Sequence, residues 1–594
     1  MRSPAEIRFR LRQEAANVAL WLRPPGLREI PSPGPLAPLP DPGAVAVSLK
    51  DTPYRDRVRA TAERVMRGCV PVLGFEVETG KEIHWRRDAL SGIETPLEYF
   101  RHIPYLDVSR AGDHKVIWEL SRHQHLVLLA QEYCFSRERR FVDEIVRQLE
   151  SWWADNPFQR GMNWTSALEV AFRALSWCWI WHLVSRELTE TFRARFATEL
   201  YRHGLHLEYN LSVYFSPNTH LLGEAVALHA IGRLFPELPR SRRWVKLAGS
   251  IIEEQIQRQV RDDGSHFEQS AYYHVYATDM FLFHALIAET TAGYRERLAR
   301  MADYLESLIG PNGLLPMFGD DDGGRFFDPY SDRRTYALET LAVFGRGRDA
   351  RHGWSLASWW GTLSGADAPR ELKLTLQSGM VIEADGVYQV LFDAGPFGPG
   401  SGGHSHADTL SVIVRRGPEE ILIDPGTYTY VGDPEWRNRF RGTAMHNTVR
   451  IDGLDQAEPG TPFSWLTKPE VRMTGPWAGE CAHRGFVHRR SIEREGPAKW
   501  IINDEIEGPV GEHLLEQFWH PGCPTKLESP HRARIGKHCT LTIKPTDAFE
   551  STEGGEFGWR SPVLGVREPA PVLRVRRTTA LPASFRTELN LEAD

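Results

Sequence analysis

Cysteine is scarce in this chain and forms no recognisable motif. Its 594 residues include six cysteines, and no two of them are spaced as Cys-x-x-Cys. This pattern excludes a cysteine zinc site and a disulfide framework of the kind found in small secreted domains. We therefore expect the thiols to be reduced and buried.

Long apolar runs are also missing. The N-terminal segment MRSPAEIRFRLRQEAANVALWLRPPG is positively charged but lacks the apolar core and small-residue cleavage site of a secretory signal. No stretch reaches the roughly 18 apolar residues that a membrane span requires. We therefore expect no membrane span and a cytoplasmic protein, with export to the periplasm or the medium by another route as the alternative.

A strong excess of one charge is absent as well. The net charge is -7 and 25% of the residues are charged, so overall charge gives no indication of a nucleic-acid partner. Aromatic residues are plentiful by contrast, with 19 Trp and 17 Tyr. Such residues fill helical cores, and they also stack on sugar rings.

The spacing of apolar residues predicts a helical first part. Residues 1–54 are expected to form an N-terminal helix and a proline-rich linker. Within residues 55–364, apolar residues recur three and four apart, and short Pro, Gly and Asn loops separate the segments. Antiparallel helix pairs in a bundle or an (α/α) toroid follow from this pattern. The predicted helices lie near 55–68, 113–134, 138–153, 164–184, 188–206, 218–234, 240–260, 268–290, 294–308 and 332–346.

From residue 365 the period changes to two, beginning with Leu372–Leu376. Short alternating segments separated by turn residues are typical of an antiparallel β-sandwich. We therefore predict the α+β class, with a helical domain at 55–364 and a sandwich at 365–594. The other predicted strands are 387–392, 409–414, 420–424, 446–451, 485–493, 499–506, 514–519, 539–544 and 572–577.

Polar residues at the ends of three predicted strands form a candidate metal site. His404 and His406 precede one strand in the run Gly-Gly-His-Ser-His-Ala-Asp, Asp424 ends the next strand, and His446 enters the third. Neutral imidazoles with a carboxylate are ligands that suit zinc. The alternative is a set of histidines on a solvated sheet edge.

Two polar clusters of the helical part could carry chemistry. In the first, Asn218 and His220 stand where a helix begins and could face a cleft, although Asn218 could simply be an N-cap. The second runs from Asp263 to His274 and places tyrosines beside histidines and a carboxylate. Such a tyrosine could be an acid or base, with aromatic helix packing as the alternative.

Two further segments yield weaker expectations. Three aspartates flanked by glycines precede Arg325, and we expect them to fix a loop that aims this arginine. A solvated acidic turn is the alternative. Asn163 and Trp164 precede a helix and could line a sugar subsite.

Taken together, these residues resemble the heparinase II/III superfamily of polysaccharide lyases. The resemblance implies an (α/α) toroid followed by an antiparallel β-sandwich with the cleft between them, and β-elimination of a uronic-acid polysaccharide. The matching segments, in the order of the family, are Ser216–His220, Asp263–His274, Gly403–Asp408, Ile423–Tyr428 and His446–Thr448.

The resemblance also implies roles for individual residues. Asn218, helped by His220, would neutralise the substrate carboxylate. Tyr273 would be the acid, with an additional role as base left open, and His404 would be the second acid/base. The implied ligands of a structural zinc ion (Zn2+) are His406, Asp424 and His446. Two departures leave alternatives open: Thr219 stands where many relatives have Asn, and Tyr272 directly precedes Tyr273.

The expected partner is an acidic polysaccharide or oligosaccharide, with no nucleic acid and no specified oligomeric state. The candidate substrate-binding residues are Asn163, Trp164, Glu268, Arg325 and Arg441. The alternatives to a lyase are a glycoside hydrolase, which needs a carboxylate pair such as Glu268 and Asp320, and a non-catalytic protein of glycan binding or exopolysaccharide assembly.

Overall fold

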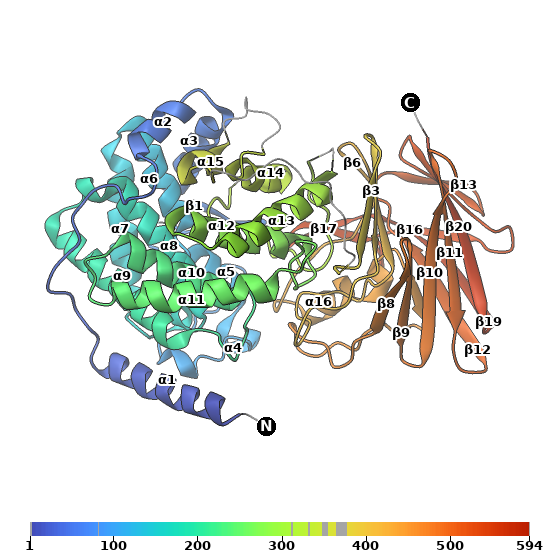
Figure 1. Cartoon of the computed structure of the whole chain (residues 1–594), viewed down its shortest axis with the longest axis horizontal. Helices are drawn as coiled ribbons and strands as arrows, with labels where there is room; N and C mark the ends of the chain where they lie inside the picture. Colours follow the sequence, from blue (N-terminus) through green and yellow to red (C-terminus); the bar gives the residue numbers. More distant parts are fainter. Residues whose placement is uncertain are drawn as a thin grey trace.

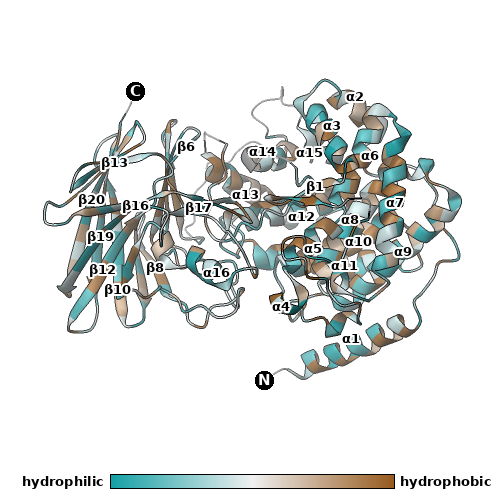
Figure 2. Cartoon of the chain, turned by 180° about the vertical axis from the view of Figure 1, so that it is seen from behind, coloured by the Kyte–Doolittle hydropathy of each residue, from teal (hydrophilic) through white to brown (hydrophobic). Residues whose placement is uncertain are grey.

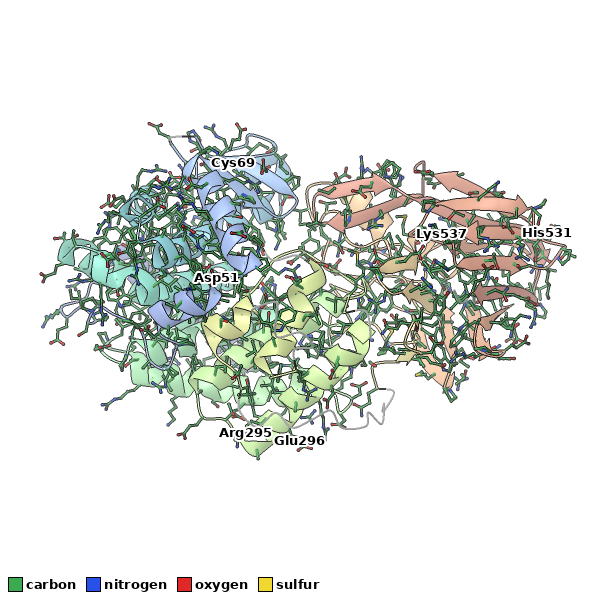
Figure 3. The ribbon with its side chains drawn as sticks, turned by 90° about the horizontal axis from the view of Figure 1, so that it is seen from above. Asp51, Cys69, Arg295, Glu296, His531 and Lys537 are labelled. Atoms are coloured by element: carbon green, nitrogen blue, oxygen red, sulfur yellow. The ribbon has the colours of Figure 1, made fainter. Side chains whose placement is uncertain are left out.

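Most helices lie in the first part of the chain and most strands in the second. The computed structural model describes residues 3–80, 82–310, 313–330, 333–346, 354–363 and 377–592. A helical lobe and a β lobe lie side by side (Figure 1). Seen from above, Cys69 and Asp51 mark the helical lobe and His531 lies at the far end of the β lobe (Figure 3). The predicted strand at 372–376 and the boundary at 364/365 lie outside the described residues.

The ten predicted helical segments coincide with helices. The segment 113–134 is divided, because His123 adopts a left-handed conformation with φ of 61°. The principal helices of this lobe are α3 (Pro53–Met66), α5 (His114–Ser121), α6 (Gln124–Ser136), α7 (Arg139–Asp155), α8 (Ala167–Val184), α9 (Glu190–Asn210), α10 (Thr219–Leu234), α11 (Ser241–Gln259), α12 (Ala271–Ile287), α13 (Ala292–Ile309) and α14 (Arg333–Val343). Shorter or peripheral ones are α1 (Pro4–Leu22), α2 (Pro42–Leu49), α4 (Val108–Ala111) and α15 (Ser355–Trp360).

Burial alternates along the helical lobe. Every residue of α8 is buried, and α6, α10 and α12 are nearly so. The helices between them, α7, α9, α11 and α13, bury one face. Hydrophobic residues accordingly gather on helices in the interior of this lobe (Figure 2). An inner ring inside an outer ring is the predicted toroid. None of the described helices is both long and apolar enough to cross a membrane.

The β lobe consists of antiparallel sheets packed face to face. One four-stranded sheet has the order β3-β4-β5-β6, a second has the order β16-β19-β12-β7, and an eight-stranded sheet has the order β13-β14-β15-β20-β11-β10-β9-β8. Their facing side chains share one hydrophobic core. The strands are β3 (Met380–Ala384), β4 (Tyr388–Asp393), β5 (Ser411–Arg416), β6 (Glu419–Leu422), β7 (Val449–Ile451), β8 (Glu470–Gly475), β9 (Ala478–His483), β10 (Phe486–Arg494), β11 (Lys499–Glu507), β12 (Glu512–Trp519), β13 (Thr525–Ser529), β14 (Arg532–Ile535), β15 (Cys539–Ile543), β16 (Phe549–Glu553), β19 (Pro571–Ala580) and β20 (Ala583–Leu591).

The predicted α+β class, a toroid followed by an antiparallel sandwich, is therefore confirmed. Several strands were not predicted, among them β8 and β13, whose side chains are mostly half or fully exposed. Such edge strands have few apolar residues, and their alternation is weak. The hairpin β1 (Cys69–Val72) and β2 (Phe75–Glu78) in the helical lobe was also missed.

Polar contacts fix the β lobe against the toroid. Gln389 on β4 donates to the carbonyls of Ser307 and Leu308 at 2.8 and 3.2 Å, and Arg415 on β5 donates to that of Leu308 at 2.6 Å. The C-terminal carbonyls of α13 thus find their partners on a sheet of the other lobe. The hairpin β17 (Trp559–Val563) and β18 (Val566–Pro569) reaches towards the helical lobe (Figure 1), where Gly74 donates to the carbonyl of Leu564 at 3.3 Å.

Candidate functional site

A single carboxylate joins the two lobes where the predicted site residues meet. Asp320 follows α13 and has no exposed surface. Its oxygens accept hydrogen bonds from His404 Nδ1 at 3.1 Å, His406 Nε2 at 2.9 Å and Arg437 Nη2 at 2.8 Å. Burial alone would raise the pKa of Asp320, but the Arg437 charge and the histidine hydrogen bonds hold it well below its usual range. The acidic loop of the helical lobe (residues 319–325) thus holds the histidine loop of the β lobe (residues 402–408).

The predicted acid–base residues Tyr273 and His404 are stacked on each other. Their ring centroids are 3.8 Å apart, with 23° between the planes. The Tyr273 hydroxyl is 3.2 Å from that of Tyr430 and donates to Asp322 at 3.3 Å. With Nδ1 on Asp320, His404 directs Nε2 towards Glu268, whose Oε1 is 3.7 Å away. The structure therefore brings together two residues from different lobes.

The start of α12 explains how Tyr273 reaches this position. Ser270 is the N-cap, and its hydroxyl accepts from the Tyr273 amide at 3.1 Å and donates to the carbonyl of Asp320 at 2.6 Å. Tyr272 points elsewhere: its ring stacks on Tyr276 with centroids 5.5 Å apart, and its hydroxyl has no hydrogen-bond partner among the described residues. Of the two adjacent tyrosines, Tyr273 is the one that faces His404.

Asn218 both caps a helix and faces the site. Its Oδ1 accepts from the His220 amide at 3.1 Å at the start of α10, and its Nδ2 donates to Glu268 at 2.6 Å. Burial raises the pKa of Glu268 and lowers that of His220 to about 4, so the imidazole of His220 is neutral at neutral pH. Asn218 and His220 are half-buried, whereas Thr219 is fully buried.

The predicted metal ligands also converge. His406, Asp424 and His446 are joined by Asp408, and their ligand atoms lie within 4.8 Å of one another. All four side chains are buried, and His446 Nδ1 is 3.0 Å from Asp424. Two ring nitrogens, Nδ1 of His406 and Nε2 of His446, have no hydrogen-bond partner among the described residues. Two carboxylates and two such imidazoles fit a divalent cation.

Asp320 lies behind this cluster and binds one of its histidines. It binds the Nε2 of His406 at 2.9 Å, which leaves Nδ1 for an ion. Such a carboxylate behind a histidine ligand fixes its tautomer and its orientation. Asp408 was not predicted as a ligand, although it follows His406 by two residues, as His406 follows His404.

Asn163 and Trp164 do not line a subsite, contrary to the prediction. Neither has exposed surface. The Asn163 amide donates to the carbonyl of Trp85 at 3.1 Å and to Asn156 at 2.8 Å, while Trp164 packs on Trp152 and Phe158. Both residues belong to the toroid core, where aromatic packing and satisfied hydrogen bonds explain their presence.

Arg325 and Arg441, which were also predicted to bind substrate, make their contacts within the protein. Arg325 is 6% exposed and lies 3.8 Å above the ring of Tyr336, inside the helical lobe. Arg441 has no exposed surface, and its guanidinium donates to backbone carbonyls of the loop at 461–464 and lies above Trp465. The acids before Arg325 bind other partners: Asp320 binds Arg437 and the histidines, and Asp322 binds Lys115 at 2.9 Å.

The polar residues behind Tyr273 were not predicted from the sequence. Lys115, Glu119 and Arg122 lie four and three residues apart in a helical segment whose residues are all buried. Charges at such spacing on an otherwise apolar helix are a signal of a buried network. Tyr430, whose hydroxyl meets that of Tyr273, lies near the recognisable Asp424-Pro425-Gly426 turn but carries no motif of its own.

Comparison with known protein families matches most of the chain. Residues 61–331 match the family model described as heparinase II/III N-terminus, and residues 367–576 match that described as heparinase II/III-like, C-terminal. A heparin-sulfate lyase of Bacteroides stercoris is 24% identical over 442 residues, which cover 67% of this chain and 62% of that protein. A heparin-sulfate lyase of Pedobacter heparinus is 27% identical over 436 residues, covering 68% and 62%. The chain thus spans less than two thirds of these relatives.

Solved structures share the fold. A crystal structure of heparinase III superposes with a TM-score of 0.69 at 15% identity, covering 98% of this chain and 90% of that one. The heparan sulfate lyase of Pedobacter heparinus gives a TM-score of 0.52 at 20% identity, covering 92% and 87%. At these identities the likeness concerns the toroid and the sandwich.

The loop that carries Asn218 yields a prediction about pH. Glu224 on α10 is fully buried and accepts 2.6 Å hydrogen bonds from the amide and hydroxyl of Ser212, which begins this loop. Burial raises the pKa of Glu224 to about 8. A carboxyl whose pKa is higher in the folded chain stabilises fully below its unfolded pKa, and this stability is lost as pH rises towards 8.

Glu224→Gln keeps the shape but removes the titration. We expect its free energy of unfolding, relative to that of the wild type, to rise by about 3 kcal/mol between pH 5 and pH 8. Denaturant unfolding at several pH values measures this difference. The exposed Glu237→Gln is the control and should show no such trend. Parallel curves for wild type and Glu224→Gln would contradict the prediction.

Proposed function

Because the chain belongs to the heparinase II/III superfamily, we propose that it is a polysaccharide lyase that cleaves a uronic-acid-containing glycan by β-elimination. The observation that carries this proposal is the stack of Tyr273 on His404, one residue from each lobe. The relatives' name, heparin-sulfate lyase, supports a glycosaminoglycan of the heparan type as the substrate class.

The reaction first requires neutralisation of the uronate carboxylate, because the proton on C5 is otherwise too weakly acidic. Asn218 and His220 stand at the N-terminus of α10, where the helix dipole favours an anion. The Asn218 amide has two N–H groups, and Glu268 takes one of them. The other can bind the substrate. Glu268, whose pKa is raised by burial, adds a carboxyl group that donates to the uronate when it is neutral.

An acid and a base then complete the elimination. In the neutral form of His404, Nδ1–H bonds to Asp320, and Nε2 then holds the lone pair that takes the C5 proton. Burial alone would lower the pKa of His404, but the hydrogen bond to Asp320 and the charge of Glu268 raise it, so the fraction of this base form grows as pH rises. Tyr273 gives its hydroxyl proton to the departing glycosidic oxygen. Burial and the nearby Asp322 charge raise the pKa of Tyr273 well above its usual value, which keeps this proton in place at neutral pH. The C5–H and C4–O bonds break, and a C4–C5 double bond forms.

The geometry disfavours a glycoside hydrolase. Such enzymes use two carboxyl groups that flank the scissile bond. Asp320 has no exposed surface, and its oxygens are occupied by Arg437, His404 and His406. Glu268 is thereby left without the partner carboxyl group that the sequence had suggested.

We further propose that His406, Asp408, Asp424 and His446 hold a structural zinc ion. These residues come from the histidine loop, the end of β6 and the entry to β7, so a shared ion would cross-link three segments around His404. The bound ion would supply rigidity and take no part in proton transfer.

The elimination itself is tested on heparan-type and other uronate polymers by the ultraviolet absorbance of the unsaturated product. We expect absorbance to rise with wild-type protein and the rate to fall at least about a hundredfold in Tyr273→Phe, because one proton donor is lost. Tyr272→Phe is the matched control, since its hydroxyl has no hydrogen-bond partner among the described residues, and it should keep most of the activity. New reducing ends without ultraviolet absorbance would instead indicate hydrolysis.

The zinc site is tested by metal analysis of protein purified with zinc supplied. We expect about one zinc per chain in the wild type and a clear loss in Asp424→Asn, together with a lower unfolding temperature. The exposed Asp452→Asn should retain the metal. Wild-type protein without bound zinc, or full occupancy in Asp424→Asn, would refute this assignment.

A further inference from the structure

We propose that Asp322, held by Lys115, is a positioning residue that fixes the hydroxyl of Tyr273 as the proton donor of the site. The inference rests on the proposed elimination and adds to it a residue outside the acid–base pair. Tyr273 donates to Asp322 Oδ2 at 3.3 Å, and the same oxygen accepts from Lys115 Nζ at 2.9 Å.

Asp322 is the last member of a buried chain of charges of alternating sign. The consecutive contacts are Glu169 to Arg122 at 2.7 Å, Arg122 to Glu119 at 2.7 Å, Glu119 to Lys115 at 2.7 Å and Lys115 to Asp322 at 2.9 Å. Each of these side chains is 10% exposed or less. This series of charged side chains runs from α8 through α5 to the acidic loop, and it ends at the Tyr273 hydroxyl.

Stability alone does not explain this arrangement. Burying charged groups costs several kcal/mol each, and well-packed apolar residues in their place are often equally stable or more so. The series contains three carboxylates and two cations, so one of its negative charges is not compensated within the series. Asp322 is the carboxylate at the end of the series and points at the neutral hydroxyl of Tyr273. The series of charges therefore holds a hydrogen-bond acceptor in a fixed position for Tyr273.

The charge on Asp322 persists under working conditions. Burial alone would raise its pKa, but Lys115 and Arg122 lower it to about 2. The Tyr273 hydroxyl therefore faces an anion, together with the Tyr430 hydroxyl, the His404 ring and, behind that ring, Asp320. Burial, followed by Asp322, Tyr430 and Asp320, raises the pKa of Tyr273 and so holds the proton on its oxygen.

The same geometry allows the proton to leave during the reaction. A distance of 3.3 Å is long for a hydrogen bond between a hydroxyl and a carboxylate. A departing oxygen that gains negative charge is the stronger acceptor, and the hydroxyl can turn to it at low cost. Asp322 thus keeps the donor oriented without competing strongly for its proton.

Three variants test this role: Asp322→Asn, Lys115→Met and the double variant. For Asp322→Asn we expect kcat to fall at least tenfold with KM within twofold, and the alkaline limb of the kcat–pH profile to move to lower pH. NMR of protein with 13C-labelled tyrosine Cζ, with Tyr273→Phe for assignment, should show Tyr273 ionising at lower pH than in the wild type. The neighbouring Asp321→Asn is the matched control and should leave all of these readouts unchanged.

The double variant distinguishes an effect of Asp322 on the position of the Tyr273 hydroxyl from an effect on the stability of the fold. Lys115→Met alone leaves Asp322 buried without its cation and should lower the unfolding temperature, whereas removal of both charges should restore much of it. We expect kcat of the double variant to stay low despite this recovery. A kcat that recovers with stability would overturn the proposal.

The NMR titration decides the matter even if no substrate is found. Wild-type protein that produces no unsaturated product on any polymer would remove support from the proposed function, not from the contact between Asp322 and Tyr273. In that case ionisation of Tyr273 at lower pH in Asp322→Asn still supports the positioning role. An unchanged ionisation of Tyr273 in Asp322→Asn overturns it.

Discussion

The carboxylate of Asp320 is the constraint on which the site depends. Asp320 belongs to the helical lobe, but its carboxylate is bound by three side chains of the β lobe, His404, His406 and Arg437. Removing one partner of a buried ion pair costs about 3–5 kcal/mol, because the other charge is left without compensation. The two lobes are therefore held where Tyr273 and His404 stack. Because the site is split between lobes, its geometry depends on this contact as much as on either fold.

Asp320 also links the parts of the β lobe that the proposed chemistry needs. One oxygen orients His406 in the candidate zinc cluster, and the other orients His404 two residues earlier. Arg437, the third partner, donates from Nε to the carbonyl of Pro462 at 3.0 Å, and Arg441 holds neighbouring carbonyls of the same loop. The arginines of this region thus shape the walls of the site, and the proposed carboxylate recognition falls to Asn218 and His220 on the other lobe.

Much of the fold and part of the site could be predicted from the sequence. The change from period 3.6 to period two separates toroid from sandwich, and the short motifs around Asn218, Tyr273, His404 and His446 lie at the ends of regular elements, where side chains converge. Burial could not be predicted in the same way. Tryptophan and arginine are residue types that often bind sugars, yet Trp164 and Arg441 are both fully buried. The partners of Asp320 and Asp322 come from distant segments, Arg437 and Lys115, and no local pattern joins them.

The most direct test is a crystal structure of Tyr273→Phe with a bound heparan sulfate tetrasaccharide. The account predicts a uronate between the lobes, with its carboxylate on Asn218 and His220 and its C5 about 3–3.5 Å from His404 Nε2. The ring of Phe at 273 should then lie beside the glycosidic oxygen on C4. A sugar bound with its carboxylate away from α10, or on the β lobe alone, would contradict the claim that one residue from each lobe carries the reaction.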